Sequence, residues 1–468
     1  MLVFSLLKNV WFKTIQLFSA DVIFLCFIIL LCGLNFYFYT QENQIATNQL
    51  VLHSQAIVIG FNQLGFARQP IIMMENKLYF LESKSKLSLQ VGQNIVIEGY
   101  FEPFLLDGSF DQYLLSIGIV GTVKVEKIHI YSGCNLNCYF FKNLDSLKFN
   151  YTKTYQSWFC HPDKKLLFSN LVECSDLAGL AVGLSIGGNQ NLTDKTKQNF
   201  RDLGLTHLIA VSGFQVVLML DIAAKFAEKS GLNFRVRQSL QIFMIVGLLL
   251  VVGLQAPVLR ASISALINLL ASSLGRKIST LKCLIWAGII LIFWNPAMLL
   301  SLSFQLSFAA TLGLVLLPNF SFNSSNSLHK IPEFVQEIIN MFLTSLACTL
   351  WTLPLIVQIN QKISAISVFA NVIISPFISL STILAFIGQI PILGELFLVI
   401  NSAILILILN IIDLLSKINI FIFFEKFSWW ENCLYYLFLL LILAFINIFN
   451  SKKVDLNSGD KSPNSLYS

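Results

Sequence analysis

Runs of about 20 apolar residues recur along this chain, and they constrain its fold more than any other feature. A helix of about 20 apolar residues matches the hydrocarbon layer of a bilayer. Ten runs qualify: about 22–39, 205–223, 238–256, 258–275, 280–297, 299–317, 338–357, 366–390, 392–416 and 433–450. The sequence therefore predicts a polytopic α-helical membrane protein with about ten spans.

The composition agrees with this interpretation. Apolar residues make up 56% of the 468 residues, and charged residues only 12%. Soluble domains carry about 25% charged residues. These values exclude a soluble enzyme and a disordered scaffold, and a net charge of +6 is no signature of polyanion binding.

The first apolar run follows Lys8 and Lys13 and ends in aromatic residues. A signal peptide would end in small residues, so we interpret residues 1–40 as an uncleaved anchor. Short alternating segments punctuated by glycine fill residues 41–165, which predicts a small β-barrel resembling an OB-fold. We expect a transmembrane channel domain over 166–450, with a re-entrant or interfacial segment at 166–188, and a polar cytoplasmic tail over 451–468.

Charged loop residues orient the chain. With a cytoplasmic N-terminus, most Lys and Arg near the span ends fall inside, and only Lys362, Lys417 and Lys426 lie in short outer loops. This orientation places residues 41–165 outside the cytoplasm. Cysteines in or beside that region could form disulfides there, whereas no combination suggests a metal site. These cysteines are Cys134, Cys138, Cys160 and Cys174.

Several polar motifs interrupt the apolar runs, and together they resemble the ComEC competence family. The motifs are His207-Leu-Ile-Ala-Val-Ser-Gly-Phe, Arg260-Ala, Asn295-Pro, Phe304-Gln-Leu-Ser-Phe-Ala-Ala, and Asn371 with Pro376. Upstream, the segment 106–119 resembles the Gly-x-Phe-Asp-Tyr…Gly-Ile segment that closes the N-terminal OB-like domain of the family. The resemblance covers most of the chain.

The resemblance implies a bacterial inner-membrane channel that passes single-stranded DNA into the cytoplasm during natural transformation. It also implies a translocation path lined by polar residues of the motifs: His207, Ser212, Gly213, Gln215, Arg260, Gln305, Ser307 and Asn371. Each has a structural alternative, such as helix–helix contact for the serines, snorkelling for Arg260, or pairing of Asn371 with carbonyls freed by Pro376. In the outer domain, Phe61, Tyr100 and Phe101 could stack on bases, although core packing is the alternative.

The sequence departs from the family at several points. Many members have Ser-Gly-Leu-His where this chain has Gln215, and Gly187-Gly-Asn189 replaces an expected charged pair. Many members also carry a metallo-β-lactamase-like domain, whereas here the five histidines are scattered and none follows His329. We therefore expect no catalytic residues, no metal and no cofactor, and a separate nuclease if the strand is degraded.

Other partners follow from what the sequence lacks. No Walker-type phosphate-binding loop is present, so a cytoplasmic helicase or ATPase would supply the energy. A periplasmic DNA-delivery protein, single-stranded DNA and membrane lipid complete the expected partners. Two alternatives stay open: a secondary transporter or lipid-linked solute flippase using His207 and Asp221, and an intramembrane serine hydrolase using Ser212.

Overall fold

The computed structural model describes residues 49–161 and 172–443, apart from short internal gaps. The gaps are 65–66, 75–76, 84–88, 90–92, 105–113, 116–118, 132–135, 188–191, 210–211, 254, 317–331, 389–393 and 429. The described residues form two compact units. One contains the residues up to Leu147 with Leu254–Arg276 and Ile285–Phe304, and the other contains Lys148–Gly253, Lys277–Leu284 and the residues from Gln305 onward.

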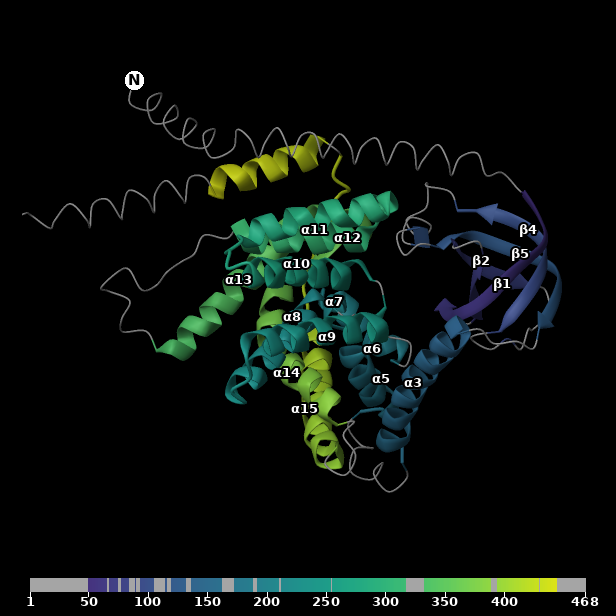
Figure 1. Cartoon of the computed structure of the whole chain (residues 1–468). Coiled ribbons are helices and arrows are strands. Elements are labelled where there is room, and N and C mark those ends of the chain that lie inside the picture. Colours follow the sequence, from purple (N-terminus) through teal and green to yellow (C-terminus); the bar gives the residue numbers. More distant parts are fainter. Residues whose placement is uncertain are drawn as a thin grey trace, which may run out of the picture. The chain divides into compact units, whose positions relative to one another are not determined.

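Helices dominate the second unit and also contribute to the first (Figure 1). In chain order they are α3 (Leu136–Phe159), α5 (Cys174–Ser185), α6 (Asp194–Asp202), α7 (Thr206–Ile209), α8 (Gly213–Lys229), α9 (Phe234–Val252), α10 (Ala256–Ser273), α11 (Thr280–Trp294), the 3-10 helix η1 (Pro296–Leu300), α12 (Leu302–Leu316), α13 (Glu333–Asn360), α14 (Ser367–Ile387), α15 (Gly394–Lys417) and a last helix, Trp430–Leu443. The strands β6 (Lys362–Ser364) and β7 (Phe421–Phe423) pair antiparallel.

The core of the second unit lies where α5, α14 and α15 pack together with the second half of α3. Leu180, Ala385 and Leu405 are fully buried there. Tyr155 of α3 is fully buried as well, and its hydroxyl donates a hydrogen bond to the Ala385 carbonyl. A small residue such as Ala385 lets neighbouring elements approach closely, as is common where membrane helices pack.

Five described helices are long and apolar enough to cross a membrane: α9, α10, α13, α14 and α15. The expectation of about ten spans is therefore confirmed only in part. The helix α11 has 15 residues, and at 1.5 Å per residue it falls short of a hydrocarbon layer of about 30 Å. The helix α12 is described over 15 residues, up to Leu316. The N-terminal anchor lies outside the described residues.

Three expected elements differ in detail. The run 205–223 is divided between α7 and α8, because Ser212 starts a new helix. The expected span 366–390 corresponds to α14, which covers Ser367–Ile387 and continues through Pro376. Residues 136–159, which the β pattern was expected to include, form α3, and from Lys148 onward this helix belongs to the second unit.

The last helix begins at a defined cap. The Ser428 backbone N–H and hydroxyl donate hydrogen bonds to a Glu431 carboxylate oxygen at 2.7 and 2.8 Å. These bonds lower the pKa of Glu431. Such capping satisfies donors at a helix start and favours negative charge there.

The first unit contains a closed five-stranded barrel with the strand order β1-β2-β3-β5-β4 (Figure 1). Its strands are β1 (Gln49–Leu64), β2 (Ala67–Met74), β3 (Lys77–Ser83), β4 (Asn94–Pro103) and β5 (Ile119–Tyr131). The pair β3–β5 is parallel and the other pairs are antiparallel. Alternation along the strands buries one face, including Ile95 and Ile97, which are at most 1% exposed.

Two glycines allow β4 and β5 to approach each other at a register shift beside Gly99. A Cβ on Gly99 would lie 2.1 Å from the Lys124 carbonyl oxygen, and one on Gly121 would lie 2.5 Å from the Glu102 carbonyl oxygen. Both neighbours are backbone atoms of paired strands, so neither can move without opening the ladder. Closure of the barrel therefore depends on these glycines.

The first prediction is that Gly99→Ala destabilises the barrel by about 2 kcal/mol or more, because the added methyl group overpacks the β4–β5 contact. Limited proteolysis of the full chain in membranes would show earlier cleavage within β1–β5. Gly247→Ala in α9 is the matched control, since a Cβ there meets nothing within 4 Å. Equal protease resistance of Gly99→Ala and the control would contradict the prediction.

Candidate functional site

His207 lies in the short helix α7, just after the tight turn that ends α6. Gly204 makes this turn with a φ of +70°, a conformation that glycine adopts without strain. The side chain of His207 is exposed, and its Nδ1 lies 3.2 Å from the Gly204 carbonyl oxygen. The imidazole lies near the side chain of Asn371 in α14. The structure thus brings together two residues that are 164 positions apart in the sequence.

Asn371 connects α14 to α13. Its Nδ2 donates a hydrogen bond to the Ser345 hydroxyl of α13 at 3.0 Å, and the Ser375 hydroxyl donates to the Asn371 backbone carbonyl at 2.6 Å. The Asn371 side chain bonds the hydroxyls of Ser345 and Ser375, not a carbonyl freed by Pro376. The amide group instead joins two candidate membrane spans, as polar residues between membrane helices commonly do.

These contacts form one polar row across three helices, from His207 through Asn371 to Ser345, which we call the polar row. Ser345 is only 5% exposed, whereas His207 lies on the surface of the helices. The α13 hydroxyls Thr349 and Thr352 continue the same side of that helix at helical spacing. The polar row therefore offers hydrogen-bond donors and acceptors, without an acidic group, inside an otherwise apolar set of helices.

Ser212 and Gln215 fix the junction between α7 and α8. Gln215 is 3% exposed; its Oε1 accepts a hydrogen bond from the Ser212 backbone N–H at 2.7 Å, and its Nε2 donates to the Leu184 carbonyl at 2.8 Å. Leu184 lies at the end of α5, and Gly213 is the first residue of α8. One side chain thus satisfies two backbone groups that helix ends leave without partners.

The helix α5 is short and almost entirely buried, which suits the predicted re-entrant segment. Asp176 in its first turn accepts hydrogen bonds from the Thr193 backbone N–H at 2.6 Å, the Thr193 hydroxyl at 2.9 Å and the Thr196 hydroxyl at 2.7 Å. These bonds fasten the start of α6 to the start of α5. A buried carboxylate with three donors is satisfied, so we assign Asp176 a structural role.

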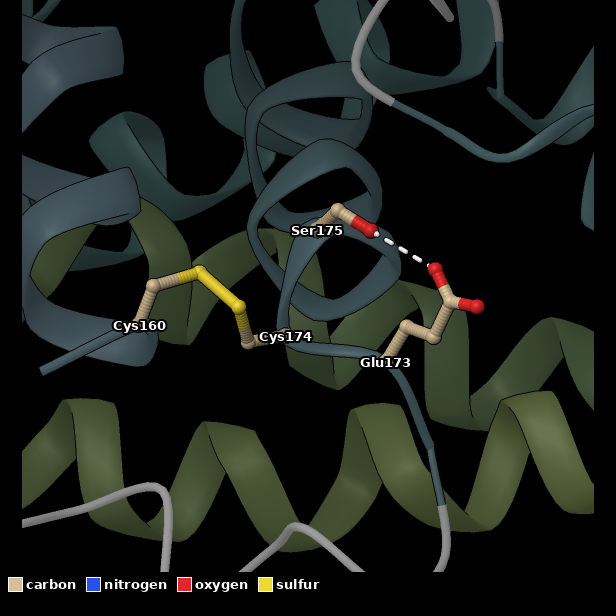
Figure 2. The surroundings of a disulfide bond; sticks show 4 residues. All are labelled: Cys160, Glu173, Cys174 and Ser175. Carbon is tan, nitrogen blue, oxygen red and sulfur yellow. Dashed lines mark hydrogen bonds between the residues drawn. A yellow bond between two sulfur atoms is a disulfide. The ribbon is translucent and has the colours of Figure 1, made fainter. Parts of the chain in front are cut away.

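A disulfide joins Cys160, directly after α3, to Cys174, the first residue of α5 (Figure 2). The Cα atoms are 5.3 Å apart. Beside it, the Ser175 hydroxyl donates to the Glu173 carboxylate at 3.3 Å (Figure 2). Two of the four predicted cysteines are therefore paired. Cys134 lies outside the described residues, and the side chain of Cys138 in α3 is not described.

The remaining motif residues lie on α10 and α12. Arg260 occupies the first turns of α10, behind Pro257, and is partly buried. Arg260 belongs to the first unit. Gln305 and Ser307 are partly buried in α12, and the Ser307 carbonyl accepts a hydrogen bond from the Thr311 hydroxyl at 2.9 Å. Asn295, from another motif, donates to the Leu115 carbonyl at 2.8 Å within the first unit.

The predicted base-stacking aromatics have different environments. Phe61 lies in β1, but its side chain is not described. Tyr100 is 45% exposed, whereas Phe101 is 8% exposed and packs edge-to-face against Tyr79 at 5.3 Å in the barrel core. Of the three, only Tyr100 is shown to present a ring to solvent.

The geometry bears on a serine hydrolase and on a metal site. Among the described residues, no hydrogen bond joins His207 to Ser212, the contact that a serine nucleophile and its base would need. No group of three His, Cys, Asp or Glu side chains is arranged to hold a metal ion in that part of the chain.

Sequence reasoning missed Asp176 and Ser345. The hydroxyls of Ser345, Thr349 and Thr352 recur at helical spacing within an apolar run, and this pattern could have marked one polar side of α13. Nothing in the sequence pairs Asp176 with Thr193, because the contact depends on how α5 and α6 meet.

A second prediction concerns Gln215. Gln215→Ala leaves the Ser212 N–H and the Leu184 carbonyl without partners, and each loss costs about 1–3 kcal/mol. Thermal unfolding of the detergent-solubilised chain should therefore begin at a clearly lower temperature. Gln358→Ala, an exposed position in α13, is the control and should not change unfolding. An unaltered unfolding temperature for Gln215→Ala would refute the assigned role.

Comparison with known proteins gives two matches. The Competence protein family matches residues 184–448, more than half of the chain, and this range includes α7, α8 and the polar row. ComE operon protein 3 of Bacillus subtilis (strain 168) is 26% identical over 211 residues, which cover 45% of this chain and 26% of that relative. The match thus spans about a quarter of the relative's length, and no solved structure matches. The chain belongs to the Competence protein family.

Proposed function

We propose that the chain is a multi-pass channel of the bacterial inner membrane, through which single-stranded DNA enters the cytoplasm during natural transformation. Membership of the Competence protein family and the similarity to ComE operon protein 3 support a role in competence. The observation that most supports a channel is the polar row, which runs from α7 through α14 to α13 among apolar helices.

The charge of a DNA strand sets the physical demand on such a path. Each nucleotide carries a phosphate charge, and a charge at the centre of a bilayer is costly unless water or polar groups surround it. The helix α14 contains no charged residue, and the only acidic residues of α13 are Glu333 and Glu337 near its start. Hydroxyl and amide groups would let a polyanion pass without holding it or repelling it.

The barrel would guide the strand before it enters. Its strand order, with β3 parallel to β5, supports the expected OB-like fold, and Tyr100 offers an exposed ring for base stacking. The proposed partners are a periplasmic DNA-delivery protein and a cytoplasmic helicase or ATPase. A separate nuclease would degrade the second strand if degradation occurs.

Paired charges support an outer position for one end of the second unit. Lys362 lies 2.8 Å from Asp202, and Asp413 lies within 3.1 Å of both Lys195 and Lys417. Lys362 and Lys417 are exceptions to the positive-inside rule, and their pairing with carboxylates reduces the cost of that exception. The Cys160–Cys174 disulfide supports an oxidising compartment for the start of α5, which Asp176 fastens to α6.

The topology can be tested through the disulfide, our third prediction. In intact cells, a permeant maleimide should leave Cys160 and Cys174 unlabelled unless a reductant is added first. Cys174→Ser should destabilise the chain by about 3 kcal/mol, the value for a closed loop of about 15 residues. Cys433, an exposed free cysteine, is the internal control for reagent entry. Labelling of both residues without reductant would contradict an extracytoplasmic position.

The channel is tested by transformation, our fourth prediction. A strain without the gene should still take DNA into the periplasm but lose transformation. Asn371→Leu should lower transformation at least about tenfold, because it replaces the amide that links His207 to Ser345 by an apolar group. Asn360→Leu, at the exposed end of α13, should have little effect. Normal transformation in the deletion strain would rule out the proposal.

A proton-coupled secondary transporter is the second candidate, because the exposed imidazole of His207 lies among membrane helices. Asp221, the expected second titrating group, is exposed and lies 2.7 Å from Lys225. Loss of transformation together with unchanged proton flux in His207→Ala would favour the channel.

A further inference from the structure

Pro354 lies within α13, six residues before the helix ends, and breaks its backbone hydrogen bonding. Proline has no N–H, so the carbonyl four residues earlier, that of Leu350, loses its helical partner. In this protein the partner comes from another helix. The Tyr435 hydroxyl of the last helix donates a hydrogen bond to the Leu350 carbonyl at 2.9 Å.

The next residue repeats the contact. The Tyr436 hydroxyl donates to the Trp351 carbonyl at 3.1 Å, and the Tyr436 and Trp351 rings lie 5.8 Å apart between their centroids. On α12, Gly313 makes room for the Trp351 side chain, since a Cβ there would lie 2.6 Å from its ring. The backbone around Pro354 is thus held by the last helix, and the neighbouring side chain is enclosed by α12.

The tyrosines and the polar row lie on opposite sides of α13. At about 100° per residue, Pro354 lies half a turn around the helix from Ser345. Ser345 meets Asn371 of α14, whereas Leu350 and Trp351 meet the last helix. The hydroxyls of Thr349 and Thr352 donate to the carbonyls of Ser345 and Cys348, four residues earlier. Such bonds favour bending, so the helix is deformable near Pro354 and depends on its contacts for its shape.

We propose that Tyr435 and Tyr436 are positioning residues for the translocation path: their hydroxyls hold α13 at the Pro354 break and thereby keep Ser345 against Asn371. The effect on DNA passage rests on the proposed function, whereas the effect on α13 does not. The tyrosines do not contact the DNA strand; they act through the backbone of α13.

Cys348 provides a native reporter of this arrangement. It is three residues after Ser345 on α13, its side chain is partly exposed, and its Sγ lies 3.9 Å from the Ala310 carbonyl of α12. The experiment treats the full chain in membrane vesicles with a small water-soluble methanethiosulfonate and quantifies modified Cys348 by peptide mass spectrometry. Transformation is measured in parallel for the same variants.

The double variant Tyr435→Phe/Tyr436→Phe should raise the labelling rate of Cys348 at least about fivefold, because it leaves the Leu350 carbonyl without a partner. Adding Pro354→Ala should suppress the effect, because alanine at this position has a backbone N–H that can donate to the Leu350 carbonyl. The triple variant should therefore label at the rate of Pro354→Ala alone. Gln358→Ala, at an exposed position of α13, is the control and should label like the unmodified protein.

Equal Cys348 labelling in the unmodified protein and the double variant would overturn the proposal. So would a triple variant that labels as fast as the double variant, because the defect would then have nothing to do with Pro354. If labelling follows the expected pattern and transformation also falls and recovers with it, the link to the path is supported. Expected labelling with unchanged transformation would support the positioning of α13 and count against the proposed channel.

Discussion

Hydrogen bonding of polar groups inside apolar helices is the constraint on which the second unit depends. In hydrocarbon, no water is present to bond a carbonyl or an amide that lacks a partner, so another helix must supply the hydrogen-bonding group. The Leu350 carbonyl at Pro354 is paired with Tyr435, the Asn371 amide with Ser345, and Ser381 with Asn401 at 2.7 Å. Each bond fixes which helices are neighbours, so α13, α14, α15 and the last helix are held in register by polar contacts as well as by packing.

The ends of the helices follow a different rule, because charges can reach water there. Near α6 and the β6–β7 pair, lysines form ion pairs with aspartates, such as Lys362 with Asp202. Asn419, just before β7, also donates a hydrogen bond to the Asp202 carbonyl of α6 at 2.8 Å. Surface ion pairs contribute little stability individually. In the proposed orientation, the aspartates would offset the positive charge of lysines on the side that the positive-inside rule keeps poor in Lys and Arg.

The sequence predicted the features that depend on local pattern. Apolar periodicity predicted the long helices, alternation with glycine predicted the barrel, and the polar motifs led to His207 and Asn371. It could not predict that Asn371 bonds Ser345 or that Tyr435 donates to the Leu350 carbonyl, because those contacts join residues 26 and 85 positions apart. Of the ten expected spans, five are helices long enough to cross a membrane within the described residues. Apolar composition does not show where a helix ends, and Ser212 with Gln215 divides a run that looks continuous.

Single-channel recording tests the proposed passage of single-stranded DNA through this chain most directly. The purified full chain would be reconstituted in a planar bilayer, and single-stranded oligonucleotides of increasing length would be added to the barrel side. A channel for single-stranded DNA should give an ionic conductance with transient blockades whose duration increases with strand length, and no such blockades with double-stranded DNA. A membrane that stays non-conducting, or a conductance that single-stranded DNA leaves unchanged, would contradict it.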